Sequence, residues 1–322
     1  MTSVNAPAPE NPELIVRTAL LPALSRRLIT ANEVMRPSAP RRTRWKPLHT
    51  PEVSYEILLD GAGSYPDPSD SIRKLDNSTT IFSVPFARMG VVPFGGRSTA
   101  VKLQDGSVWL AASHPLTPST LQTLSELGPI KHIVMLDAEH GMYTKQYHDA
   151  YPAAKLYFPA RGVDSWRKKG WLPADESQVF AYGAGCKPGE AVADPFEATT
   201  GGEIKSADFG KAFINEDIAF LHAPTRTLIE ADLLLNLPPK EQYERSTKRS
   251  SLPFLSQHMQ PGTHLHQRFI YSLASKDKVG MKAAAEKVAA WDFDRIIPCH
   301  GDVIETGGKK AWLDTYAWFL EQ

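Results

Sequence analysis

Three apolar, strand-like runs in this chain end abruptly in side chains that can bind a metal ion. Residues 130–136 are followed by Asp137, Glu139 and His140, a second run ends at Asp232, and a third ends at His300. In layered α/β proteins the loop after a strand opens into the crevice where ligands bind. We therefore expect these three strand ends to meet and to build one site from distant parts of the sequence.

The first half of the chain alternates between strand and helix patterns. Residues 98–103 and 107–111 flank Gln104-Asp105-Gly106, and an Asp-Gly pair between apolar runs predicts a hairpin. Residues 117–127 have the cap, proline and leucine spacing of a helix, which Gly128-Pro129 ends. Further strands and short helices follow up to residue 169, and this alternation predicts an α/β sheet with crossover connections.

The second half reads differently. Residues 202–205, 212–213, 217–222 and 227–231 have strand patterns separated by short turns, which predicts an antiparallel meander. Residues 236–277 form a polar, proline-interrupted insertion, and helix, strand and helix patterns follow at residues 279–291, 295–298 and 309–320. Two sheets with outer helices, an αββα sandwich, fit this order of elements.

Length and charge narrow the class of protein. The 322 residues fit one α/β domain at residues 81–322 after an N-terminal extension at residues 1–80, in which residues 35–51 resemble a linker. A formal net charge of zero argues against a general nucleic-acid binder, and we expect no membrane span because no run of 18 apolar residues occurs. No motif indicates the oligomeric state.

Cysteine content bears on the compartment. Cys186 and Cys299 are the two cysteines, too few for a disulfide framework, so we expect a reducing, cytoplasmic location. Residues 14–31 contain three arginines and no acid, which leaves a mitochondrial presequence as the weaker alternative.

Two segments carry a resemblance to known proteins. The order of elements resembles the metallo-β-lactamase fold, and the sequence is similar to the uncharacterised family DUF4336 over residues 81–320. That family shares a Thr-Leu-Ile-x-x-Asp-Leu segment, here at residues 227–233, and a Tyr-Pro-x-Ala-Lys/Arg-Leu-Tyr segment, here at residues 151–157. The resemblance implies the αββα fold and a metal site.

The resemblance also implies which metal ligands are lost and which are kept. The His-x-His-x-Asp-His motif of metallo-β-lactamase-like enzymes falls on residues 135–140, where Met135 and Asp137 replace the first two histidines. Glu139 stands for the motif's aspartate and His140 for its last histidine, while the middle histidine of the family falls near Phe213, which cannot ligate. The bridging aspartate is kept as Asp232 and the terminal histidine as His300. One half of the dinuclear site is therefore retained.

This pattern leads to two alternative functions. The first is a mononuclear metal-dependent hydrolase, in which Glu139, His140, Asp232 and His300 hold one Zn²⁺, with Fe²⁺ as the alternative. Asp137 would then act as general base in the metal-activated hydrolysis of an ester, lactone or thioester. The second is a degenerate, metal-free descendant that binds a small molecule or a partner. An iron-dependent oxygenase or isomerase is a further possibility on the same site.

Other residues offer weaker signals. His222, His264 and His266 are candidates for a lid or for support behind the ligands, although His222 also suits a turn and the other two a surface loop. Cys299 is expected to point away from its neighbour His300 and to lie in the core. The loop at residues 90–96, with Arg88 and Arg97 beside it, either grips an anionic or apolar substrate or serves only as a turn into the next strand.

Overall fold

The computed structural model describes residues 70–183, 194–274 and 277–321. The expected N-terminal arm up to residue 69, with residues 14–31 and 35–51, lies outside the described residues, and so does Cys186. The first sheet already begins at Ser71, before residue 81, where the sequence analysis placed the start of the domain. No helix of the described part is long and apolar enough to cross a membrane.

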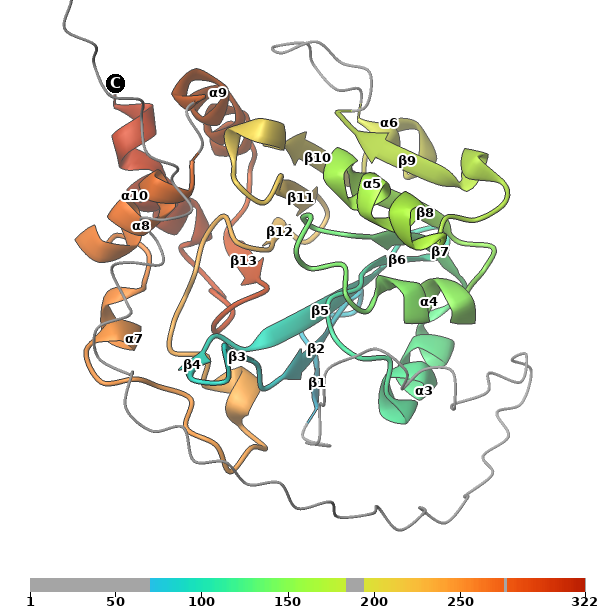
Figure 1. Cartoon of the computed structure of the whole chain (residues 1–322), viewed down its shortest axis with the longest axis horizontal. Helices are drawn as coiled ribbons and strands as arrows, with labels where there is room; N and C mark the ends of the chain where they lie inside the picture. Colours follow the sequence, from blue (N-terminus) through green and yellow to red (C-terminus); the bar gives the residue numbers. More distant parts are fainter. Residues whose placement is uncertain (1–69, 184–193, 275–276, 322) are drawn as a thin grey trace, which may run out of the picture. The chain divides into compact units, whose positions relative to one another are not determined.

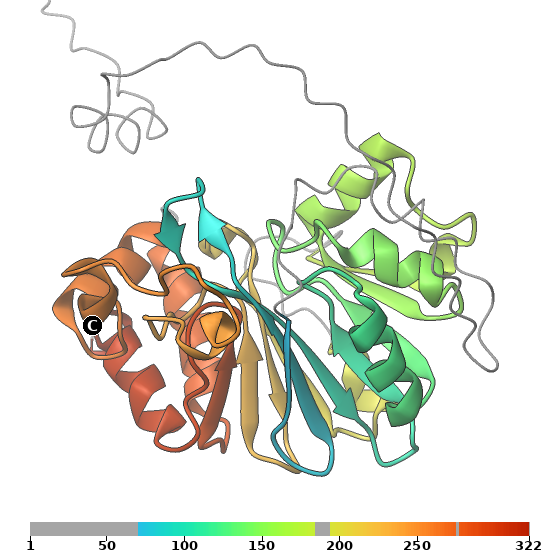
Figure 2. The ribbon, with the colours of Figure 1, turned by 90° about the horizontal axis from the view of Figure 1, so that it is seen from below.

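Two β-sheets stack at the centre of the described region (Figures 1 and 2). The first has the strand order β1-β2-β5-β6-β7-β8-β9 and the second has the order β10-β11-β12-β13. The strands of the first sheet are β1 (Ser71–Lys74), β2 (Thr79–Val84), β5 (Gly96–Lys102), β6 (Val108–Ala111), β7 (Ile130–Val134), β8 (Lys155–Pro159) and β9 (Val179–Tyr182). Those of the second are β10 (Ile204–Asp208), β11 (Ile218–His222), β12 (Thr227–Glu230) and β13 (Arg295–Pro298). A separate hairpin consists of β3 (Ala87–Arg88) and β4 (Val92–Pro93).

Helices cover the outer faces of both sheets (Figure 2). On the first sheet lie α3 (Pro118–Leu127), α4 (Thr144–Ala150) and α5 (Ala160–Lys169). On the second lie α8 (His264–Leu273), α9 (Lys278–Ala289) and α10 (Gly308–Leu320). The shorter helices are α6 (Pro195–Thr199), α7 (Leu255–His258), and the 3-10 turns η1 (Glu176–Gln178), η2 (Gly210–Ala212) and η3 (Glu241–Tyr243).

Three apolar clusters separate the four layers. One fills the space between the sheets and includes Trp109, Phe220 and Ile297, all fully or almost fully buried. The other two lie between each sheet and its helices, around Phe158 and Trp166 on one side and around Trp312 on the other. Because each sheet buries both faces, interior strands such as β6, β8 and β11 are largely apolar. The predicted αββα sandwich is confirmed.

Local sequence explains the elements that were predicted best. Thr117 accepts a hydrogen bond from the backbone N–H of Thr120 and begins α3, and Pro118 occupies its first turn. Gly106 adopts a φ of +80° in the turn between β5 and β6, a conformation that the Asp-Gly pair favours. The strand expected at residues 212–213 was wrong, because residues 210–212 form the 3-10 turn η2 instead.

Candidate metal centre

The pairing of β12 with β13 brings two of the expected ligands together. These strands are parallel, with Glu230 opposite Pro298, and the backbone N–H of Cys299 donates to the carbonyl oxygen of Glu230 at 3.0 Å. Asp232 and His300 each lie two residues beyond that pair, at the carboxyl ends of neighbouring strands. Their side chains consequently meet, with Asp232 Oδ1 3.3 Å from His300 Nε2.

His140 arrives from the other sheet, in the loop after β7. Two backbone hydrogen bonds tie this loop to the segment before β11, from Ala138 N–H to Asn215 O and from Ile218 N–H to Leu136 O. The carboxylate of Asp137 turns the loop, since its Oδ1 accepts from the backbone N–H groups of Glu139 and His140 at 2.8 and 2.7 Å. The same oxygen lies 2.8 Å from His140 Nδ1, so Asp137 also orients the imidazole.

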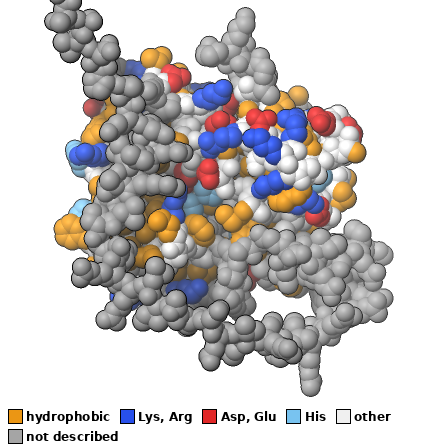
Figure 3. Space-filling model, in the orientation of Figure 1, with side chains coloured by type: hydrophobic (Ala, Val, Ile, Leu, Met, Phe, Trp, Pro, Cys, Tyr) orange, Lys and Arg blue, Asp and Glu red, His pale blue; other side chains and the backbone are white. Residues whose placement is uncertain are grey.

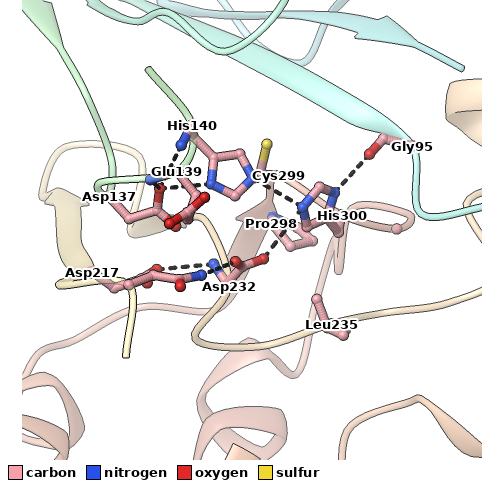
Figure 4. Close-up of polar contacts among 12 residues, drawn as sticks. Gly95, Asp137, Glu139, His140, Asp217, Asp232, Leu235, Pro298, Cys299 and His300 are labelled. Atoms are coloured by element: carbon pink, nitrogen blue, oxygen red, sulfur yellow. Dashed lines mark hydrogen bonds and ion pairs between the residues drawn. The ribbon is translucent and has the colours of Figure 1, made fainter. Parts of the chain in front are cut away.

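The two imidazoles face each other through their Nε2 atoms, which are 2.9 Å apart (Figure 4). His300 Nδ1 lies 2.6 Å from the carbonyl oxygen of Gly95, and His140 Nδ1 lies against Asp137. Both of these neighbours accept hydrogen bonds, so each Nδ1 carries the proton and each Nε2 of the neutral ring presents a lone pair. Two lone pairs at this distance repel each other unless a proton or a metal ion lies between them. This arrangement suits two metal-ligating histidines, whose Nδ1–H groups are typically fixed by such partners.

Cys299 lies in the core between the sheets, as expected, but its thiol also joins this group instead of pointing away from His300. One ligand atom from each of His140, Cys299 and His300 lies within 4.8 Å of the others, and the same holds for Asp137, His140 and Asp232. Only the expected direction of the thiol was wrong, because β13 ends at Pro298 and the alternation of a strand no longer applies to Cys299. The residue is 2% exposed and its thiol faces the two rings (Figure 4).

Within the cluster, the charges of the histidines shift the pKa values of the acidic groups, and the acidic groups shift those of the histidines. Burial alone raises the pKa of Cys299, but the neighbouring His140 and His300 lower it to about 7. Burial alone lowers the pKa of His140, but Asp137, Cys299 and Asp232 raise it well above its usual value. Burial raises the pKa of Asp232, but the same two histidines bring it below its usual range. The cluster therefore favours positive charge at its centre, which a divalent cation would supply as well as protons do.

Asn215 and Asp217 lie behind Asp232 and were not identified from the sequence. Asn215 Nδ2 donates to Asp232 Oδ2 at 2.5 Å, and the backbone N–H of Asp232 donates to Asp217 Oδ1 at 2.9 Å. Burial raises the pKa of Asp217 well above its usual value, and the charges of Asp137 and Asp232 add to this. Phe213, where the family register places the middle histidine, is buried in the core beneath α8 and α9. No local pattern marks Asn215, because its role depends on contact between the loop before β11 and the loop after β12.

Two buried side chains clamp the backbone on both sides of His300. Gln242, from η3 in the insertion, donates to the carbonyl oxygen of Cys299 at 2.7 Å and accepts from the N–H of Gly301 at 2.8 Å. Arg97 donates to the carbonyl oxygens of Pro298 and Gly301 at 2.6 and 2.8 Å, and also binds Glu241. The insertion at residues 236–277 thus supports the loop that carries Cys299 and His300.

The structure does not bring Glu139 into the cluster. Its side chain is 65% exposed and lies 3.4 Å from the guanidinium of Arg161, while its neighbour Asp137 points inward. The reason is the tight turn around Asp137 Oδ1, which directs His140 to the interior and Glu139 to the rim. One oxygen of Asp137 is occupied by the turn and by His140, while its Oδ2 has no hydrogen-bond partner among the described residues.

The three histidines expected to form a lid or a support lie elsewhere. His222 is buried and contacts Thr225 Oγ1 at 2.7 Å in the turn between β11 and β12. His264 packs edge-on against Trp318 of α10, with ring centroids 5.2 Å apart. His266 is fully buried, and its Nε2 accepts from the backbone N–H of Leu235 at 3.0 Å. Of these, only His266 supports a segment close to Asp232.

A pocket of about 140 Å³ opens onto the cluster. Its lining combines the donor residues with a partly apolar rim: Phe86, Arg88, Gly96, Ser113, Glu139, His140, Met142, Tyr143, Asp232, Cys299 and His300. Figure 3 shows this face, on which hydrophobic and charged side chains surround exposed histidine atoms. A larger hollow at the start of α10 contains none of the clustered donors.

The two facing sheets, the outer helices and the donors at strand ends define a protein of the metallo-β-lactamase fold. A flavodiiron protein variant from Thermotoga maritima matches with a TM-score of 0.53 and 14% identity, over 79% of this chain and 63% of that chain. A metallo-β-lactamase from Erythrobacter litoralis matches with a TM-score of 0.50 and 11% identity, over 80% and 98%. A metal-soaked flavodiiron core from Synechocystis sp. matches with a TM-score of 0.50 and 12% identity, over 79% and 61%. At these identities the likeness establishes the fold alone.

The family follows from the sequence itself. The family model described as "Domain of unknown function (DUF4336)" matches residues 89–267, more than half of the chain, and the chain belongs to this family. Both the fold and the family predicted from the sequence are thus confirmed. A comparison with curated protein sequences gives no match.

Proposed function

We propose that this protein is a metal-dependent hydrolase with a mononuclear centre that acts on an ester, a lactone or a thioester. The observation that carries the proposal is the pair of Nε2 atoms 2.9 Å apart, each on a ring whose Nδ1 is fixed by an acceptor. Two nitrogen ligands at about 2.0–2.1 Å from a tetrahedral zinc ion lie about 3.3 Å apart, so the two Nε2 atoms at 2.9 Å would have to separate by less than about 0.5 Å to hold an ion.

The ligand set that we propose differs from the one expected from the sequence. His140, His300 and Asp232 are retained, and Cys299 takes the place of Glu139, because its thiol lies within 4.8 Å of a ligand nitrogen of each histidine. Two imidazoles, one carboxylate and one thiolate suit Zn²⁺ and also Fe²⁺. The thiolate and the carboxylate offset the charge of a divalent ion within a buried site.

The chain's own residues prepare the site for hydrolysis. An ion held there would supply Lewis acidity, which activates water and polarises a substrate carbonyl. Asp137 keeps the proton on His140 Nδ1, and Gly95 does the same for His300, so both Nε2 lone pairs stay directed at the centre. Asn215 fixes the second oxygen of Asp232, and the clamp formed by Gln242 and Arg97 prevents the loop of His300 from moving away.

Metal analysis tests the proposal most directly. We expect about one zinc or iron ion per chain, measured by inductively coupled plasma mass spectrometry on the full chain purified without chelators or an affinity metal. The double variant Asp232→Ala, His300→Ala should lose the ion, whereas His264→Ala should keep it, because His264 packs against Trp318 instead. Metal-loaded protein should then hydrolyse one of the three substrate classes, and the double variant should not.

The alternative of a metal-free binding protein has one observation in its favour. A single proton shared by the two Nε2 atoms, together with the contact between His300 and Asp232, would also satisfy the buried polar groups. A metal content near zero in both the native chain and the double variant would overturn the hydrolase proposal and favour this alternative.

A further inference from the structure

The pocket carries a cation, Arg88, whose charge helps to lower the pKa of Asp232 but whose N–H donors the proposed metal chemistry does not use. Arg88 lines the pocket beside His140 and His300, and within the described part of the chain its guanidinium has neither a hydrogen bond nor an ion pair. The rim acid Glu139, by contrast, already lies 3.4 Å from Arg161. An unpaired guanidinium offers several N–H donors in one plane, a geometry that matches a carboxylate or a phosphate.

Arg88 is held on an arm that is anchored to the donor cluster. It belongs to the β3–β4 hairpin, where Gly90 N–H donates to Ala87 O at 3.0 Å and Phe94 N–H donates to Phe86 O at 2.9 Å. At the base of this hairpin Phe86 stacks on the His300 ring at a centroid distance of 6.1 Å, and Phe94 meets it edge-on at 5.5 Å. Arg88 therefore stands at a defined position relative to His300.

The size and lining of the pocket indicate where the rest of a substrate would lie. At about 140 Å³ the pocket is smaller than the roughly 300–1,000 Å³ of typical small-molecule sites, so it holds little more than the reacting group. The remainder must lie along the rim, where Met142 is 56% exposed and the hairpin tip presents Met89 at 86% exposure. Ser113 adds a buried hydroxyl oxygen with no hydrogen-bond partner, available to a polar group of the substrate.

We propose that Arg88 binds an oxyanion of the substrate, a carboxylate or a phosphate, so that the site selects anionic acyl compounds with an apolar body. This inference rests on the proposed hydrolase function for its acyl chemistry, but the recognition of the anion is a property of Arg88 and the rim. Neutral esters of the same length would lack the partner that the guanidinium offers.

Matched probes separate charge from shape. Binding of monomethyl adipate and dimethyl adipate, and of hexyl phosphate and 1-hexanol, would be measured by titration calorimetry on the metal-loaded full chain. We expect the anionic member of at least one pair to bind about tenfold more tightly than its neutral partner. The pair with the larger preference distinguishes a carboxylate from a phosphate as the natural group.

Variants of exposed arginines supply the decisive comparison. Arg88→Gln should remove the preference for the anion and change the affinity for the neutral probe by no more than about twofold, since a rim contact to a neutral chain is a minor part of its binding. Arg226→Gln, an exposed arginine paired with Asp292 at the β11–β12 turn, should behave like the native chain.

Three results would overturn the inference: an unchanged preference in Arg88→Gln, an equal affinity for charged and neutral probes in the native chain, or no binding of either anion. Metal content is measured on the same samples. A chain without metal but with an anion preference that depends on Arg88 would refute the hydrolase proposal while leaving anion recognition standing.

Discussion

The carboxylate of Asp137 is fully buried and serves two neighbours with one oxygen. It closes the turn after β7 and it holds His140 Nδ1, while its other oxygen has no hydrogen-bond partner among the described residues. A metal-binding histidine is commonly oriented by such a carboxylate, and loss of this partner typically weakens metal binding or activity about 10- to 100-fold. Asp137 therefore matters to the proposed centre without having to bind the ion.

We expect Asp137→Asn to weaken metal binding about 10- to 100-fold, because the amide keeps the shape of the turn but loses the charge that supports His140. Competition with a chromophoric chelator measures this affinity. Glu139→Gln is the matched control, since it changes the neighbouring acid on the exposed rim and should leave the affinity unchanged. If Glu139→Gln weakened binding as much as Asp137→Asn, the ligand set read from the family motif would be favoured over the one proposed here.

At the scale of elements, the insertion between β12 and β13 reaches back to hold the loop after β13. The amide of Gln242 makes one hydrogen bond on each side of His300, and the side chain of Gln242 is almost fully buried. The close fit extends to Gly95, where a Cβ atom would meet the Gln242 side chain well inside contact distance. The clamp thus fixes both the backbone of His300 and, through Gly95, the acceptor of its Nδ1–H.

Gln242→Ala should destabilise the fold by about 1–3 kcal/mol, because it removes the side-chain donor to the buried carbonyl oxygen of Cys299 and one of the two acceptors of the Gly301 N–H, the other being the carbonyl oxygen of Phe94. It should also lower metal affinity, since the loop gains freedom. Gln267→Ala is the comparison, because Gln267 makes a similar amide-to-backbone bond to Asp314, far from the donors. If Gln242→Ala lost stability but bound metal as tightly as Gln267→Ala does, the clamp would be structural only. Thermal unfolding and chelator competition give the two readings.

At the scale of the whole described region, the proposed centre joins the two sheets. His140 belongs to a loop of the first sheet, whereas Asp232, Cys299 and His300 follow strands of the second. An ion bound by all four would cross-link the two halves of the sandwich in the native state and not in the unfolded chain, and ligand binding of this kind raises stability by mass action.

Removal of the metal with a chelator should therefore lower the thermal midpoint. An ion present at 100 times its dissociation constant stabilises the native state by about 2.7 kcal/mol, so we expect a decrease of roughly 5 °C or more. Re-addition of zinc should restore the midpoint in the native chain but not in Asp232→Ala, His300→Ala. A midpoint that does not respond to the chelator would contradict a centre that links the sheets.

The sequence predicted the architecture well because interior strands of both sheets, such as β6 and β11, are apolar runs with clear ends. β1 and β9 were missed, since the first is a short polar edge strand and the second lies beside polar turns. At the site, the strand-end rule identified Asp232 and His300, whose proximity follows from the parallel pairing of β12 and β13. Cys299, Asn215 and Gln242 were not identified, because their positions depend on loop geometry and on contacts between segments distant in sequence.

The parallel pairing of β12 and β13 also means that the positions of the donor atoms and the substrate specificity depend on different parts of the chain. Because the register of these strands sets the spacing of Asp232 and His300, the long connection between them does not have to keep a fixed length. Related chains could gain or lose helices there, as long as a residue equivalent to Gln242 still reaches the loop of His300. A change in this connection would then alter which substrates reach the site, while the donor atoms stay where they are.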